Sequence, residues 1–107
     1  MLNQIVLVGR LTKDLELKKG ENGTKYASMT LAIPRAFKNA EGEYETDFIE
    51  CKLWNTIAKN TCEYCKKGDI VGVKGRIQTE SVDGAYKINV IAERVTFLSS
   101  KPKEEDE

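Results

Sequence analysis

The sequence predicts an all-β domain with a single helix, and three observations favour this fold class. The 107 residues are enough for one hydrophobic core but not for two. Five stretches have the alternating or continuously apolar pattern of β-strands and are separated by polar or glycine-containing turns. Only one stretch, between the third and fourth strands, has helical spacing. We therefore expect a small five-stranded architecture with its helix between strands 3 and 4.

The first strand is predicted at residues 3–11, a run rich in β-branched side chains. Such a run is either buried on both faces or alternates with one face against a partner. Gly9 near its end indicates a bend or a bulge. Residues 14–18 continue this strand beyond the bend, and the glycines and asparagine of residues 19–23 predict a turn.

The second strand is predicted at residues 24–34. Its apolar side chains alternate with small or polar ones, so one face is expected to be buried; these apolar residues are Ala27, Met29, Leu31 and Ile33. Pro34 lacks a backbone donor and is expected to end regular pairing. Residues 35–45 then form a polar hairpin, in which Phe37 lies beside Arg35 and Lys38 and contributes nothing obvious to a core.

The third strand, residues 46–54, has two faces of different character. Side chains alternate across a strand, so Ile49, Cys51 and Leu53 are expected to face the core. The opposite face carries Phe48 and Trp54 at its ends with charges between them, a combination on which nucleic-acid bases can stack. The alternative for each ring is ordinary packing under a neighbouring loop.

The helix is predicted at residues 56–66, with Asn55 as its N-cap and two lysines at its negative end. Its apolar stripe consists of Ile57, Ala58, Cys62 and Cys65. The fourth strand, residues 70–80, is expected to turn Val71, Val73 and Ile77 inward, with Gly72 and Gly75 permitting strong curvature. Asp83-Gly84 predicts a tight hairpin turn, and the fifth strand spans residues 85–98.

Five strands, curvature-permitting glycines and this helix position fit an OB-fold, a Greek-key barrel that binds oligonucleotides or oligosaccharides. An immunoglobulin-like sandwich is less consistent with the pattern, because it requires more strands and no helix.

Charge and composition exclude several classes of protein. No signal peptide or membrane-spanning segment is apparent, so we expect a soluble, cytoplasmic protein. Two lysines and four carboxylates in residues 101–107 give this tail a net charge of minus two, which leaves plus two for residues 1–100. That excess is small for a protein that reads duplex DNA. The acidic tail has too few apolar residues to order itself.

The sequence gives little support for a catalytic site or a metal site. The chain has no histidine, which removes the commonest general base and metal ligand. Cys62 and Cys65 form a Cys-x-x-Cys pair, but tetrahedral zinc needs about two further ligands and only Cys51 remains. We interpret the cysteines as small buried side chains. The sequence thus predicts a binding protein, with no catalytic residue, no metal and no cofactor.

Five motifs, in order and spacing, resemble those of the bacterial and phage single-stranded DNA-binding protein family. They are Asn3 to Leu11, Thr30 to Ala32, Phe48 to Trp54, Tyr64 to Gly68 and Val73 to Ile77. The resemblance covers about residues 1–98. It implies an OB-fold that usually assembles as a homotetramer, often by pairing of the first strands, and that wraps single-stranded DNA without catalysis during replication, recombination or repair in the nucleoid.

The resemblance also implies site residues. Three aromatic residues match positions at which family members stack bases, namely Phe37, Phe48 and Trp54. Seven cations are expected along the phosphate path: Arg10, Lys13, Lys18, Arg35, Lys52, Arg76 and Lys87.

Two departures from the family pattern affect these expectations. Val82 occupies a position that is often aromatic, so the hairpin between the fourth and fifth strands is expected to bind weakly. Long family members end in a linker and an acidic tip with hydrophobic residues that recruit partners. Here residues 100–107 are acidic without that hydrophobic anchor, as in a short form, and weak or absent recruitment is expected.

Two other functions remain open from the sequence. One is an OB-fold accessory protein, primosomal or RNA-binding, that acts mainly through protein contacts. The other is an interaction domain in which the three aromatic rings form a protein interface. A hydrolase is a poor third, because no acid-base pair is visible.

Overall fold

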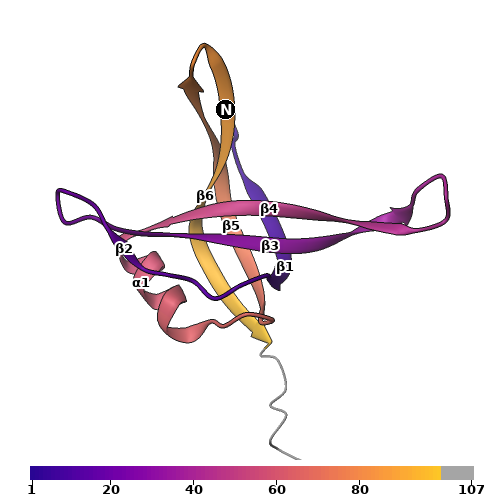
Figure 1. Ribbon diagram of the computed structural model, residues 1–107, viewed down its shortest axis with the longest axis horizontal. Helices are drawn as coiled ribbons and strands as arrows, with labels where there is room; N and C mark the ends of the chain where they lie inside the picture. The colour runs from indigo at the N-terminus through magenta and orange to yellow at the C-terminus, as the bar shows by residue number, and fades with distance from the viewer. Residues whose placement is uncertain (100–107) are drawn as a thin grey trace, which may run out of the picture.

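The computed structural model describes residues 1–99, which form six strands and one helix (Figure 1). The elements are β1 (Ile5–Leu11), β2 (Lys18–Lys19), β3 (Lys25–Lys38), β4 (Tyr44–Trp54), α1 (Asn55–Tyr64), β5 (Ile70–Val82) and β6 (Ala85–Ser99). The five long strands are those predicted, and α1 follows the third of them. The two-residue β2 was expected as part of the first strand. The predicted tail, residues 100–107, lies outside the described residues.

The strands close into a barrel. Their order is β1-β5-β6-β4-β3-β2, and a further pairing of β1 with β3 joins the two sides. Closure occurs at the end of β1, where Arg10 pairs with Ile70 of β5 and with Ala32 of β3. The pairing of β4 with β6 is parallel, whereas all others are antiparallel. This architecture confirms the predicted OB-type barrel.

The core consists of the inward faces that alternation predicts. Met29, Leu31, Cys51 and Leu53 are essentially inaccessible to solvent, as are Val71 and Val73 of β5. Burial of a side chain of this size contributes about 1.5 to 3 kcal/mol. The order of apolar residues in β3, β4 and β5 therefore determines which face of each strand closes the barrel.

Gly75 provides the curvature that β5 requires. The register between β5 and β6 shifts between Lys74 and Gly75, which is a β-bulge. A Cβ atom on Gly75 would lie 2.0 Å from the carbonyl oxygen of Ile91. Only glycine permits this close approach of the two backbones.

Both long hairpins project from the barrel (Figure 1). Among residues 1–99, no element covers the inward side of β5 beyond the barrel, so Ile77 is 40% exposed and the prediction that it faces the core is wrong. The turn at Asp83 and Gly84 has φ angles of 51° and 82°, which confirms the predicted two-residue hairpin. On the other hairpin, β3 extends past Pro34 to Lys38, although regular pairing is interrupted there as expected.

The ends of the helix differ from the prediction. Trp54 is the N-cap, no side chain caps the helix, and Asn55 adopts a φ of 57° as the chain leaves β4. Asn55 therefore does not cap the helix with its side chain. The helix ends at Tyr64, so the two lysines expected in its last turn lie beyond it. Its packed face carries Ala58 and Thr61, as well as the predicted Ile57 and Cys62.

Candidate nucleic-acid interface

The exposed face of β4 carries the two rings that alternation predicts. Phe48 is 67% exposed and Trp54 is 42% exposed, whereas Cys51 and Leu53 between them point into the core. On the neighbouring strand, the small Ala32 pairs with Phe48. The surface beside Phe48 is therefore open to a flat ligand.

Tyr26 extends this face and was missed by sequence reasoning. It pairs with Trp54 across β3 and β4, and the two ring centroids are 5.7 Å apart with the planes tilted by 40°. Alternation along its strand only places Tyr26 on the face opposite the apolar residues. The register between the two strands, which sequence periodicity does not give, was needed to place it beside Trp54.

Phe37 lies away from these rings on the β3–β4 hairpin. Its side chain is 84% exposed. Near it, Lys38 and Tyr44 form the last pair of the ladder, with the Lys38 ammonium 5.7 Å from the centroid of the Tyr44 ring. The hairpin thus carries an exposed ring and a cation at some distance from the barrel (Figure 1).

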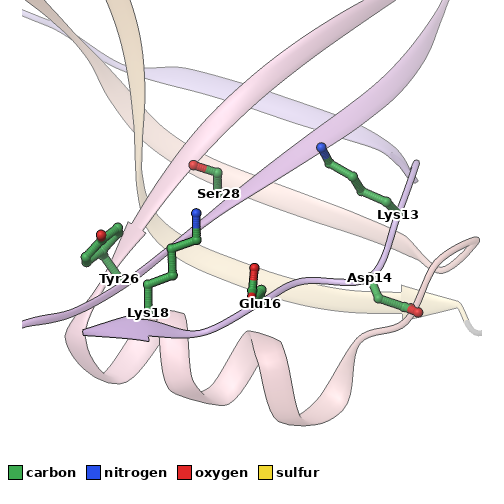
Figure 2. Close-up of a pocket in the computed structure, with 6 residues that line it drawn as sticks. All are labelled: Lys13, Asp14, Glu16, Lys18, Tyr26 and Ser28. Carbon is green, nitrogen blue, oxygen red and sulfur yellow. The ribbon is translucent and has the colours of Figure 1, made fainter. Parts of the chain in front are cut away.

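A hollow of about 200 Å³ lies beside Tyr26, between β3 and the segment that joins β1 to β2 (Figure 2). It is lined by Lys13, Asp14, Glu16, Lys18, Tyr26 and Ser28. Lys13 and Lys18 extend from the two ends of this segment toward β3, on which Ser28 lies, whereas the Asp14 carboxylate is turned away (Figure 2). Asp14 accepts a hydrogen bond from the Lys67 backbone N–H at 2.7 Å. Two ammonium groups and a hydroxyl provide donors suited to a phosphate.

The seven predicted cations divide into two groups. The arginines already have partners. Arg10 donates a hydrogen bond to the Gly68 carbonyl oxygen at 2.7 Å, and Arg35 forms ion pairs with two carboxylates. Arg76 Nε lies 3.4 Å from Glu93 Oε2. The lysines differ, because none of the ion pairs found in residues 1–99 includes one of them; these lysines are Lys13, Lys18, Lys52 and Lys87.

Glu80 of β5 interacts electrostatically with two of these lysines. Its carboxylate accepts a hydrogen bond of 2.9 Å from the amide of Asn89, which is buried. This hydrogen bond and the positive charges of Lys52 and Lys87 lower the pKa of Glu80. Because Lys52 belongs to the face with Phe48 and Trp54, the Glu80 carboxylate interacts electrostatically with a cation of the candidate interface.

The three cysteine thiols are expected to be unreactive. Burial raises the pKa of Cys51 and of Cys65 to about 11, and it also raises the pKa of Cys62. Thiols in this state stay protonated near neutral pH, whereas zinc binds the thiolate. In the part of the chain that the structure describes, no cluster of three potential metal ligands occurs, and no helix is long and apolar enough to cross a membrane.

Comparison of the structure with solved ones returns proteins of the same architecture. A deletion mutant of the single-stranded DNA binding protein from Thermus aquaticus matches with a TM-score of 0.78 at 23% identity, covering 92% of this chain and 51% of that one. The wild-type protein from Thermus aquaticus matches with a TM-score of 0.71 at 28% identity, covering 96% and 43%. These matches support the fold.

Comparison of sequences gives nearer relatives. Single-stranded DNA-binding protein B of Bacillus subtilis (strain 168) is 49% identical, and the match covers 97% of this chain and 96% of that protein. Single-stranded DNA-binding protein A of the same organism is 46% identical, with 94% of this chain matching 62% of its length. The model of the single-strand binding protein family matches residues 2–98. The chain therefore belongs to the single-strand binding protein family.

Proposed function

We propose that this protein binds single-stranded DNA without strong sequence preference and protects it during replication, recombination or repair. The observation that carries the proposal is the row of exposed rings on β4, with Tyr26 beside it and lysines along it. The names of the relatives support the same function. Binding without catalysis agrees with membership of this family.

In the proposed mechanism, bases of the strand stack on Phe48, Trp54 and Phe37. Each stacked base is worth on the order of 1 to 3 kcal/mol. Every base has a flat π-face, so stacking tolerates sequence. A duplex is excluded because its bases are already stacked on one another.

Phosphates between the stacked bases are neutralised by the predicted cations other than Arg35. The hollow beside Tyr26 is one place for a phosphate, because Lys18 and Ser28 line it next to the ring that contacts Trp54. Lys52 and Lys87 provide further positive charge. Release of counterions should make log affinity fall with log salt at about 0.7 per neutralised phosphate.

We further propose assembly into a homotetramer. Two features of β1 support this. The first is an exposed apolar face, on which the side chains of Val6 and Val8 are 65% and 53% exposed. Within residues 1–99, the β1 edge opposite β5 has no strand partner from Ile5 to Gly9. A second copy can cover both the apolar face and this edge.

Residues 1–99 form the binding domain in this proposal, and the acidic residues 100–107 lie outside it. The site of action is the cytoplasm, at the nucleoid. An accessory role exercised mainly through protein contacts is not favoured, since the relatives are named for single-stranded DNA binding.

Fluorescence of Trp54, the only tryptophan, tests the function. Oligo-thymidine should quench it to saturation, more weakly at high salt, and duplex DNA of equal length should not. Unchanged fluorescence together with no retention on single-stranded DNA would contradict the proposal and favour a protein interface. Equal binding of RNA and no occlusion of long DNA would favour the accessory role.

A further inference from the structure

The ladder between β3 and β4 is interrupted at the base of the β3–β4 hairpin. Pro34 pairs with Thr46, and the next pair is Lys38 with Tyr44. Residues 35–37 of β3 therefore lie opposite Glu45 alone. Phe37 belongs to this irregular segment, so backbone pairing does not fix the position of its ring.

Side chains bridge the interruption. The Arg35 guanidinium donates to Asp47 Oδ1 from Nη2 at 2.9 Å and from Nε at 3.1 Å, and its Nη1 donates to Glu45 Oε1 at 2.8 Å. Asn39 Nδ2 donates to Glu45 Oε2 at 3.0 Å. We refer to Arg35, Asn39, Glu45 and Asp47 as the arm network. It links the regular ladder to residues beyond the interruption.

The network reaches the turn of the hairpin through Asn39. Its side-chain oxygen accepts the backbone N–H groups of Glu41 at 2.9 Å and of Glu43 at 3.0 Å. Arg35, Phe37 and Asn39 also line one shallow hollow. Polar contacts thus extend from Asp47 to the tip, along the irregular segment that carries Phe37.

The position of the arm network argues against a phosphate contact by Arg35. Side chains alternate along β4, so Glu45 and Asp47 share the side of Ile49 and Cys51, opposite that of Phe48. The guanidinium is held on this side by two carboxylates. Its planar fork binds both oxygens of the Asp47 carboxylate, since Nη2 donates to Oδ1 at 2.9 Å and Nε donates to Oδ2 at 3.2 Å.

We propose that Arg35 is a positioning residue, which holds the irregular segment of the arm so that Phe37 is presented for stacking, and that it neutralises no phosphate. This inference rests on the proposed function, because it assigns a role within the same binding site. It differs from the expectation that all seven cations follow the DNA backbone.

Two substitutions at Arg35 separate positioning from charge. Arg35→Lys keeps the charge and loses the fork, whereas Arg35→Gln loses both. Positioning predicts that both variants bind oligo-thymidine about 5-fold more weakly, a partial loss of one stacked base, with the wild-type salt slope. A phosphate contact predicts a near wild-type Lys variant and a slope lower by about 0.7 for the Gln variant. That second result would overturn the inference.

Substitution of a carboxylate gives a second test, in which the two hypotheses predict opposite changes in DNA affinity. Asp47→Asn removes a negative charge, which by electrostatics alone should tighten DNA binding. Because it also releases Arg35, positioning predicts weaker binding. Glu43→Gln is the matched control: it makes the same charge change on the same hairpin, with a side chain outside the arm network, and should bind equally or more tightly. Tighter binding by Asp47→Asn would contradict the inference.

A double-mutant cycle shows whether the effect passes through Phe37. In a Phe37→Ala background, Arg35→Lys should add less than about a twofold loss, because the positioned ring is gone. The full loss in that background would overturn the inference. Unfolding midpoints verify that the variants fold. If wild-type protein fails to bind oligo-thymidine, the proposed function falls and this inference with it; if it binds but Arg35→Lys is unchanged, this inference alone falls.

Discussion

The ring of Tyr26 lies against that of Trp54, with centroids 5.7 Å apart and planes tilted by 40°. The contact follows from the register of β3 and β4, which places the two residues opposite each other. Tyr26 is half-buried and Trp54 is more exposed. Tyr26 therefore packs against one side of Trp54, which stays partly exposed to solvent.

Removal of the Tyr26 ring should weaken binding of single-stranded DNA even though Trp54 is still present. We expect Tyr26→Ala to lower affinity for oligo-thymidine by roughly 5-fold, because aromatic pairs contribute about 0.5 to 1.5 kcal/mol. Fluorescence titration measures this, and Trp54 quenching at saturation should also change. Tyr26→Phe is the control and should behave as wild type. An unchanged affinity for Tyr26→Ala would show that Trp54 needs no support.

Substitution of Gly75 by alanine should unfold or severely destabilise the domain. The new Cβ would lie 2.0 Å from the Ile91 carbonyl oxygen, and backbone atoms cannot move aside as a flexible side chain can. Chemical denaturation should show that the free energy of unfolding falls by several kcal/mol. Gly20→Ala is the matched control, since its nearest neighbour would be 3.5 Å away and its stability should change little. Comparable stabilities for the two variants would contradict the proposed packing at the bulge.

A charge on the outer face of β1 should lower the oligomeric state. Val8 is 53% exposed and is expected to lie in a subunit interface, where a buried unpaired charge is unfavourable. Sedimentation equilibrium of Val8→Asp should give a smaller mass than wild type. Val82→Asp, at the tip of the β5–β6 hairpin, introduces the same charge at a comparably exposed residue and should leave assembly intact. A tetramer of Val8→Asp would place the interface elsewhere.

Glu80 should contribute to stability only above acidic pH. Its pKa is lowered in the folded protein, first by the Asn89 hydrogen bond and then by Lys52 and Lys87. A lowered pKa gives stabilisation that is present above the unfolded value of about 4.5 and is lost as pH falls through the folded value. Glu80→Gln keeps the acceptor for Asn89 but not the charge.

The difference in denaturation midpoint between wild type and Glu80→Gln should therefore be present at pH 7 and shrink below about pH 4.5. A difference independent of pH would show that charge is not involved. The same variant should bind single-stranded DNA somewhat more tightly at pH 7, because Lys52 and Lys87 lose a neighbouring carboxylate.

The cysteines should react slowly in the folded protein. With a pKa of about 11, only about one Cys51 or Cys65 in a thousand is a thiolate at pH 8. Cys62 is less buried, so it should account for the fastest phase of a thiol-labelling reaction. Cys62→Ser should remove that phase, and denaturant should make all remaining thiols reactive. Rapid labelling of Cys51 in native conditions would contradict the closed core.

Much of the fold was predictable because it depends on local pattern. Alternation along β3 and β4 determined that Met29, Leu31, Cys51 and Leu53 form the core, and all four are buried. Prediction failed for Ile77, whose pattern continues the buried face of β5. Alternation gives the side of a strand on which a residue lies, but not whether another element covers that side.

The barrel, the helix between its third and fourth long strands, and the exposed face with Phe48 and Trp54 could be predicted from sequence, because alternation and turn chemistry are local properties. Only the folded structure shows which side chains meet: Tyr26 with Trp54, Glu80 with Asn89, and Arg35 with Asp47. These contacts depend on strand register and on the paths of two projecting hairpins. Register is set by closure of the whole barrel, which no single stretch of sequence specifies.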